Sequence, residues 1–454
     1  MKLEIHPKAW ESFNQKIEEL KPQLRFKYEK QMIKKVSNNP NVHVSGHFDE
    51  TNIIGEIKLY SRDLSGNIAA RMFAIRGKQL GLFDEDYKNL NRIAENLQKS
   101  TNPKNVVSID LISELIFEWL KQEYFGENTQ NAIEFVLSEC EKCIREVEIW
   151  IPISHLHIES PFILGKITFK TITKKFMDEY ENSYKSEITN PDELIKLEHH
   201  FERKRSKIQN LAVATMKIEA EPKQAYEIVL DRTERVMSIL RFFSPTNLFP
   251  TKICYCAPIE KQHIDGRVYL VVKDGKVIEE ASGFSDKSIE HWNLSNEDLD
   301  TYTKVGLDFL GNLLNKKDLT DFQQKLLETL FLYSKASLAK ELSDRLVYTL
   351  VALETIFLKD ASEPIQDNIS LRMAFMHPVS VEERKLIIKN VKDTYALRSS
   401  FIHHGKRVSS DDLETLRRFM FDTWLSLTEL ISLAAKDITK QQFFEELENR
   451  RVGG

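Results

Sequence analysis

The sequence predicts an α+β protein of several domains that is mainly helical, with mixed α/β regions preceding a C-terminal helical bundle. Glycine and proline number only 15 and 13 in 454 residues, which favours long helices over tight turns. Strand-like alternation is confined to the chain before about residue 285, whereas apolar residues recur at helical spacing from residue 296 onward. We expect an N-terminal α+β region at 1–140, a strand-containing region at 141–290 and a helical domain at 291–454.

The first region should combine helices with short strands. Apolar residues at helical spacing favour a helix from Pro7 to Ser37. A Ser-Gly-Asn turn at 65–67 precedes the last of the expected strands. The expected strands are Val42–Phe48, Ile53–Tyr60 and Ile68–Ile75, and the expected helices are Asp84–Gln98 and Val107–Tyr124.

The second region is predicted to be α/β. Alternation in Val147–Ile153 and Phe162–Phe169 favours paired strands. Asp274 and Gly275 mark the turn of a hairpin. The other expected elements are the helices Glu193–Ile208 and Lys223–Phe243 and the strands Ala212–Ile218, Ile253–Ala257, Arg267–Lys273 and Lys276–Glu280.

The helix at Glu193–Ile208 carries a basic run, Arg203–Lys207. One interpretation is a strip that steers RNA. The other is a solvated helix face, which is favoured because acidic residues are interleaved just before the run.

The third region begins near Ser295, where Asn296, Glu297 and Asp298 form a helix N-terminal signal. Seven helices are expected from there, at about 296–314, 319–335, 337–358, 366–376, 381–404, 409–436 and 440–450.

The fifth of these helices ends in the candidate site. Gly405 is the residue type that commonly follows a helix C-terminus, so His403 and His404 should occupy the last turn. Arg398 lies upstream of them, and Lys406 and Arg407 follow as weaker candidate contacts for RNA. The result is a cluster of imidazoles and fixed positive charges.

Arg398 and His403 suit metal-independent cleavage of RNA. Histidine can take the 2′-hydroxyl proton or protonate the leaving 5′-oxygen, and a guanidinium can stabilise the developing charge on phosphate. Five residues of ideal helix rotate by about 140°, so the pair converges only in a distorted helix or through a second copy of the chain. Arg372 and His377 have the same spacing, but the apolar residues around them favour a structural role.

Three motifs occur in order along this domain: LVALETIF at Leu350–Phe357, ISLRMAF at Ile369–Phe375 and YALRSSFIHHG at Tyr395–Gly405. With them, the tract from about Ser337 to Ala435 resembles a HEPN domain (higher eukaryotes and prokaryotes nucleotide-binding), of the Apea-like subgroup. The resemblance implies a helical bundle that forms a homodimer in which two Arg-x4-6-His motifs face one another. In many members this arrangement is a metal-independent endoribonuclease.

The motif arginine and histidine correspond to Arg398 and His403. Tyr395, Ser399, His404 and Glu354 are expected to support them. Many nuclease members carry Asn, Asp or His at the position of Ser399, whereas serine is usual in the Apea-like subgroup. His404 duplicates the histidine, and the spacing favours His403 as the catalytic one.

The resemblance therefore implies an endoribonuclease effector of defence or toxin type, with RNA as substrate. In this interpretation residues 1–290 are the candidate sensor of a phage or cellular trigger. The alternative is a catalytically inactive HEPN module that binds a nucleotide or a protein. A third interpretation places the function in an interaction surface of the N-terminal regions.

No cofactor or metal is expected. Cys140 and Cys143, with Cys254 and Cys256, have zinc-like spacing, but the glycine-rich knuckle of such sites is missing, which favours reduced thiols. Charged residues interrupt residues 1–15, and no apolar run approaches the ~20 residues that span a bilayer, so we expect a cytoplasmic protein. The net charge of −5 restricts RNA contacts to a local basic patch.

Overall fold

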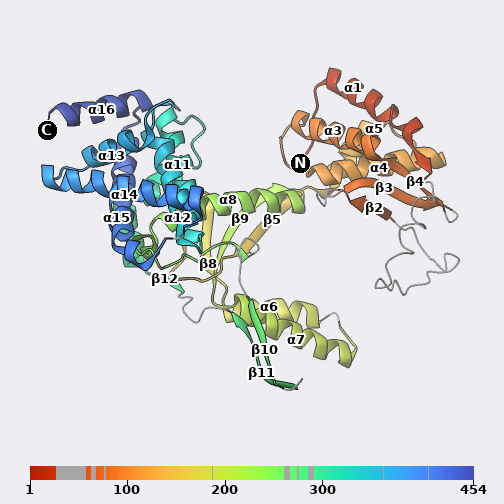
Figure 1. Cartoon of the computed structure of the whole chain (residues 1–454). Coiled ribbons are helices and arrows are strands. Elements are labelled where there is room, and N and C mark those ends of the chain that lie inside the picture. Colours follow the sequence, from red (N-terminus) through yellow and green to blue (C-terminus); the bar gives the residue numbers. More distant parts are fainter. Residues whose placement is uncertain are drawn as a thin grey trace. The chain divides into compact units, whose positions relative to one another are not determined.

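The computed structural model describes residues 1–26, 58–62, 68–75, 78–186, 188–259, 266–273, 276–284, 291–360, 362–406 and 408–453. Over these residues the chain is mainly helical and carries several small sheets, as the sequence predicts (Figure 1). It divides into two compact units, Met1–Glu148 with Lys217–Ile228, and Ile149–Met216 with Val229–Gly454. Within the described ranges, no helix combines the length and apolar character that a membrane span requires.

The first unit packs helices on an antiparallel sheet of strand order β1-β4-β3-β2. Buried apolar side chains such as Leu82, Leu90 and Ile116 join strand and helices into one core. Its helices are α1 (Pro7–Glu18), α3 (Asp84–Ser100), α4 (Ile109–Phe125) and α5 (Ala132–Cys143), and its strands are β1 (Arg25–Phe26), β2 (Lys58–Arg62), β3 (Ile68–Ile75) and β4 (Lys78–Phe83).

Sequence and structure differ at the start of this unit. The helix expected from Pro7 to Ser37 ends at Glu18, because Pro22 and the short 3₁₀ turn Lys21–Gln23 interrupt it. Strand β4, which pairs with β3, was not predicted from the sequence. The expected strand Val42–Phe48 and the first part of Ile53–Tyr60 lie outside the described residues.

Three small sheets follow in the chain. A single strand was expected at Phe162–Phe169, but Gly165, at φ 63°, turns the chain into a hairpin of two strands. The sheets are β5-β9-β8-β7, the parallel pair β12-β6 and the hairpin β10-β11, built from β5 (Arg145–Pro152), β6 (Leu156–Ile158), β7 (Phe162–Leu164), β8 (Ile167–Thr171), β9 (Ala212–Ala220), β10 (Gly266–Lys273), β11 (Lys276–Phe284) and β12 (Trp292–Leu294).

The segment Ile253–Ala257 is not the expected strand. Its backbone groups form single hydrogen bonds with separate segments of the unit. The Cys254 N–H donates to the Ser337 carbonyl over 2.9 Å, and the Ala257 carbonyl accepts from the Ser154 N–H over 2.9 Å. These long-range bonds satisfy the backbone without a ladder.

Helices α6 (Lys174–Lys185), which was not predicted, and α7 (Pro191–Ile208) pack against each other. The basic run of α7 is partly neutralised, because Arg205 Nη2 lies 2.7 Å from a Glu181 carboxylate oxygen and 2.8 Å from one of Asp178. These ion pairs favour the interpretation of a solvated, structural helix face.

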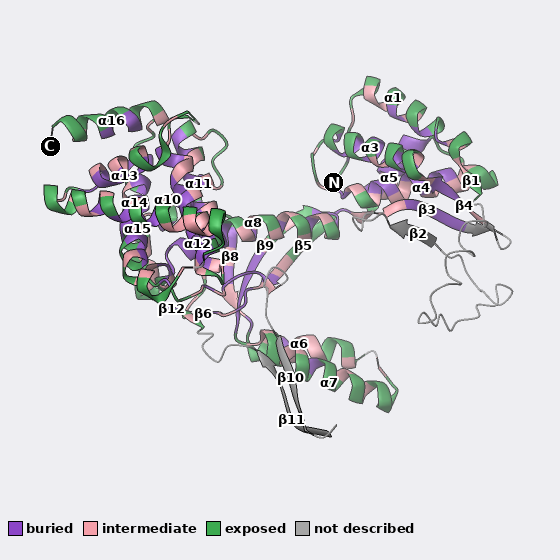
Figure 2. Ribbon diagram, in the orientation of Figure 1, coloured by how far each residue is buried: buried purple, intermediate pink, exposed green. Residues whose placement is uncertain are grey.

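The remaining chain is a helical bundle whose buried residues line the faces between helices (Figure 2). The helix expected at 296–314 is split at Gly306, which adopts φ 114° and leaves no room for a Cβ beside Ile431. The helices are α8 (Pro222–Phe242), α9 (Asn296–Val305), α10 (Leu307–Leu313), α11 (Asp321–Leu338), α12 (Leu342–Phe357), α13 (Ile365–Met376), α14 (Val381–His404), α15 (Leu413–Ala434) and α16 (Lys440–Val452).

Helix α12 shows why this bundle forms. Its buried residues Leu346, Leu350 and Leu353 recur every three or four positions and make one apolar face. At its N-terminal end Arg345, only 3% exposed, donates to the carbonyls of Thr246, Phe249, Pro250 and Lys252. The guanidinium thus ties the 246–252 loop to the bundle.

Candidate site at the end of helix α14

Helix α14 has the bounds that the sequence predicts. Ser380 and Glu383 form a capping box at its start, and Gly405 ends it at φ 64°. The Gly405 N–H donates to the Phe401 carbonyl over 2.9 Å, and the Lys406 N–H donates to the Ser400 carbonyl over 3.3 Å. The bond from the Gly405 N–H to the Phe401 carbonyl is the 5→1 bond of an αL helix end, and the helix continues to His404.

Three of the predicted site residues meet between α12 and α14. The Tyr395 hydroxyl donates to Glu354 Oε1 over 3.2 Å, and Arg398 Nη1 lies 3.4 Å from the same oxygen. Burial, followed by the charge of Glu354, raises the pKa of Tyr395, so this phenol remains a hydrogen-bond donor. One carboxylate of α12 therefore holds both the arginine and the tyrosine of the motif.

Arg398 is half-buried. Its side chain is 26% exposed, and its Nε has no hydrogen-bond partner among the described residues. One end of the guanidinium is thus fixed by Glu354, while part of the group remains accessible to an anionic ligand.

The two histidines lie beyond this group, in the last turn. Both His403 and His404 are exposed, and their ring centroids are 6.5 Å apart in an edge-on arrangement. In the described chain no hydrogen bond joins either imidazole to Arg398. Because α14 is regular, Arg398 and His403 point about 140° apart around its axis. A single copy of the chain does not direct them to one point.

The other predicted positions are peripheral. Ser399 and Lys406 are exposed, and their side chains make no hydrogen bond or ion pair in the described chain. Arg407 lies outside the described residues. Ile402, between the arginine and the histidine, is 50% exposed. The end of α14 therefore presents a mixed polar and apolar surface.

The second Arg-x4-His pair is structural. Arg372 makes a two-pronged ion pair with Glu363, with both nitrogen–oxygen distances at 2.7 Å. His377 is 9% exposed, and its Nε2 lies 2.9 Å from the hydroxyl of Ser426. Both side chains are engaged in packing the bundle, so spacing alone does not identify a site.

One ionisable residue of this domain was not singled out from the sequence. Asp422 of α15 is 8% exposed, and its Oδ2 has no hydrogen-bond partner in the described chain. Burial raises its pKa from 3.8 to about 6, against the opposing influence of Arg418 and Asn390. No local pattern marks Asp422, because its burial depends on how α14 and α15 pack.

Substituting Asp422→Asn is expected to stabilise the protein at pH 8 by about 2 kcal/mol, because a buried unpaired carboxylate is removed. The folded state holds the Asp422 proton more tightly than the unfolded state, so the wild type loses stability as pH rises from 3.8 through about 6. Urea denaturation at pH 5 and pH 8 measures the difference. The exposed control Asp411→Asn should retain the wild-type dependence, and the same dependence in Asp422→Asn would contradict this assignment.

No metal centre is formed by the residues that the structure describes: no three His, Cys, Asp or Glu side chains are arranged to hold an ion. Cys140 and Cys143 lie at the end of α5, and Cys254 and Cys256 are buried in the 253–257 segment. All four are free thiols.

Comparison with known proteins supplies no match: no family model matches the sequence, and neither a curated protein nor a solved structure does.

Proposed function

We propose that this chain is a metal-independent endoribonuclease of the Apea-like HEPN type, acting as a defence or toxin effector. The observation that carries the proposal is the end of α14. There Arg398 is anchored by Glu354, and His403 is exposed five residues later on the same helix. The ordered motifs from Leu350 to Gly405, which resemble that family, agree with the placement of Glu354 beside the motif arginine.

The chemistry assigned to the site needs only these side chains. One His403 imidazole takes the proton of a ribose 2′-hydroxyl, whose oxygen attacks the adjacent phosphorus. The 5′-oxygen leaves and takes up the proton of the imidazolium formed in the first step, so that the imidazole is regenerated and the upstream fragment ends in a 2′,3′-cyclic phosphate. Arg398 stabilises the charge that develops on the non-bridging oxygens, and Glu354 holds the guanidinium in place.

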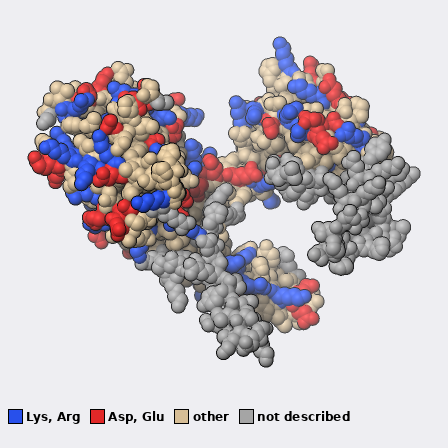
Figure 3. Space-filling model, viewed as in Figure 1, with Lys and Arg blue, Asp and Glu red and all other residues tan. Residues whose placement is uncertain are grey.

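A second copy of the chain completes this site. The regular geometry of α14 separates Arg398 and His403 around the axis, so a homodimer through the helical domain would bring the arginine of one copy to the histidine of the other. On the face seen in Figure 3, Lys and Arg are interleaved with Asp and Glu, which favours local contacts with RNA over broad electrostatic coating. Residues 1–290 would then sense the trigger.

One observation favours the alternative, a catalytically inactive module that binds a nucleotide or a protein. The Glu354 carboxylate lies 3.4 Å from Arg398 and offsets its positive charge. If this ion pair persists in the dimer, the arginine is a structural residue of the bundle.

The test is incubation of the full-length chain with mixed cellular RNA in EDTA, with analysis of fragment ends and of the oligomeric state by light scattering. The proposal expects a dimer that produces 2′,3′-cyclic phosphate ends, because no metal takes part. Cleavage that requires Mg²⁺ would contradict the mechanism. A dimer that leaves RNA intact, even when the chain is co-expressed with candidate phage or cellular triggers, would favour the inactive module.

A further inference from the structure

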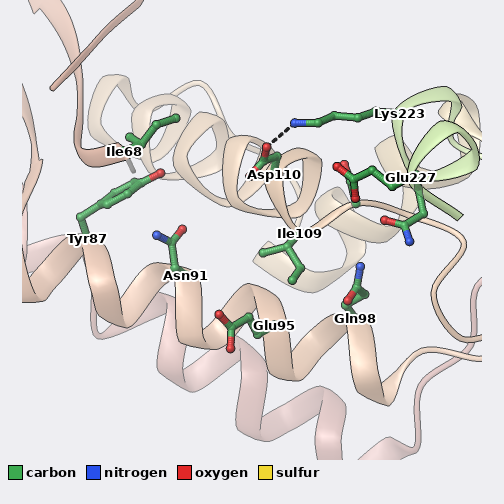
Figure 4. A pocket seen from close by; sticks show the side chains of 11 residues that line it. Ile68, Tyr87, Asn91, Glu95, Gln98, Ile109, Asp110, Lys223 and Glu227 are labelled. Carbon is green, nitrogen blue, oxygen red and sulfur yellow. Dashed lines mark hydrogen bonds and ion pairs between the residues drawn. The ribbon is translucent and has the colours of Figure 1, made fainter. Parts of the chain in front are cut away.

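A groove in the first unit has the size of a small-molecule site. It has a volume of about 710 Å³ and lies between α3, the N-terminus of α4 and the N-terminus of α8 (Figure 4). Tyr87, Asn91, Glu95 and Gln98 follow one face of α3 along its length. From Tyr87 to Glu95 this face extends about 12 Å, so the groove is elongated.

The groove is not built for an anion, although two helix N-termini meet there. Glu221 accepts from the Lys223 and Gln224 N–H groups and so caps α8, and it also accepts from the Ser108 N–H. Ser108 in turn caps α4. Lys223 is paired with Asp110, as the dashed line in Figure 4 shows. The first N–H donors of α8 are therefore occupied, and Asp110 places a carboxylate in the first turn of α4, which disfavours a phosphate.

Uncompensated negative charge remains along the groove. Glu95 and Glu227 line it at exposed positions, and neither carboxylate forms a close ion pair with a described residue, although the charge of Glu227 also acts on Lys223. With Asp110 and Lys223, which offset each other, the lining carries two net negative charges. The side-chain amide of Gln98 adds a further acceptor oxygen, whereas the Asn91 oxygen already accepts from the Ser113 hydroxyl over 3.1 Å.

The side chain of Tyr87 is an observation independent of these charges. Tyr87 is only 2% exposed, and within the described chain its hydroxyl has no hydrogen-bond partner. In Figure 4 the oxygen is directed into the groove, at the end where Ile68 supplies apolar surface. Because no described residue bonds this hydroxyl, it is free to exchange a hydrogen bond with a ligand in the groove.

The spread of these groups distinguishes between classes of cation. Among the described residues no three carboxylate, imidazole or thiolate groups converge on one point, which disfavours a single bound metal ion. An extended cation instead places charges at several positions and apolar methylenes between them. We propose that the groove binds a linear aliphatic polyamine, with ammonium groups on Glu95 and Glu227 and an N–H directed at Tyr87.

Calorimetric titration of the full-length chain with spermidine tests this site. Saturable binding of one spermidine per chain is expected. Glu95→Gln combined with Glu227→Gln should weaken it at least about tenfold, and Tyr87→Phe about threefold. The matched control is Glu11→Gln combined with Glu127→Gln, which changes the net charge equally at exposed positions outside the groove and should bind as the wild type does.

Three outcomes would overturn the proposal. They are the absence of saturable binding at millimolar spermidine, equal loss of affinity in both double variants, and tighter binding of Mg²⁺ that displaces spermidine. Unchanged unfolding midpoints would confirm that each variant is folded. Calorimetry measures spermidine binding and not RNA cleavage. The proposed polyamine site can therefore fail or succeed independently of the proposed nuclease activity.

Discussion

Alanine at His403 or at Arg398 is expected to lower RNA cleavage at least about a hundredfold, and to remove any toxicity on expression. His403 supplies proton transfer, and Arg398 supplies charge stabilisation, so neither is replaceable by solvent. His403 is exposed and Arg398 is only partly buried, so the fold should survive both changes. The measurement is the initial rate on a defined RNA in EDTA, with the unfolding midpoint of each variant.

Two control variants distinguish an effect at the candidate site from the effect of removing any exposed histidine or arginine. His199→Ala removes an exposed histidine of α7, and Arg417→Ala removes an exposed arginine of α15; both should cleave at the wild-type rate. His404→Ala should have a smaller effect than His403→Ala. Equal losses at the two histidines would contradict the assignment of His403, and cleavage that persists in both His403→Ala and Arg398→Ala would refute the nuclease mechanism.

Mixing the two inactive variants tests whether the site is shared between copies. A mixed dimer of Arg398→Ala and His403→Ala carries one intact arginine and one intact histidine on different chains. If the two act across the dimer, co-expression should recover about a quarter of the wild-type rate. If both act within one chain, the mixture should remain inactive.

Replacing Arg345 with methionine is expected to destabilise the second unit by about 3 kcal/mol. Methionine fills much of the volume but donates no hydrogen bond. The four carbonyl groups of the 246–252 loop would lose their shared donor, and these hydrogen bonds are partly or fully buried. Burial lowers the pKa of Arg345, and removing this buried charge offsets part of the loss.

Urea denaturation followed by circular dichroism measures the effect of this change. Arg345→Lys keeps a charge but loses the planar fork, so it should recover only part of the stability. Arg417→Ala, at an exposed position of the same bundle, is the control and should change the free energy of unfolding by less than about 0.5 kcal/mol. A loss below about 1 kcal/mol in Arg345→Met would contradict the structural role of the guanidinium.

Local chemistry made several elements predictable. Ser380 with Glu383 starts α14 and Gly405 ends it, because each signal acts on backbone groups a few residues away. Strand β3 and the hairpin β10-β11 were likewise predictable from alternation bounded by turn residues. The elements that differed, at Gly306, Gly165 and Ile253–Ala257, depend on packing or on distant hydrogen bonds.

The sequence by itself determined the mainly helical α+β class, the bounds of α14, and the position of Arg398 and His403 on one helix. Only the tertiary structure decided which groups surround them. Glu354 reaches Tyr395 and Arg398 from another helix, and Asp422 is buried by the packing of α14 and α15. Helical periodicity specifies which face of a helix is buried, but the partner on that face is set by how whole helices pack together.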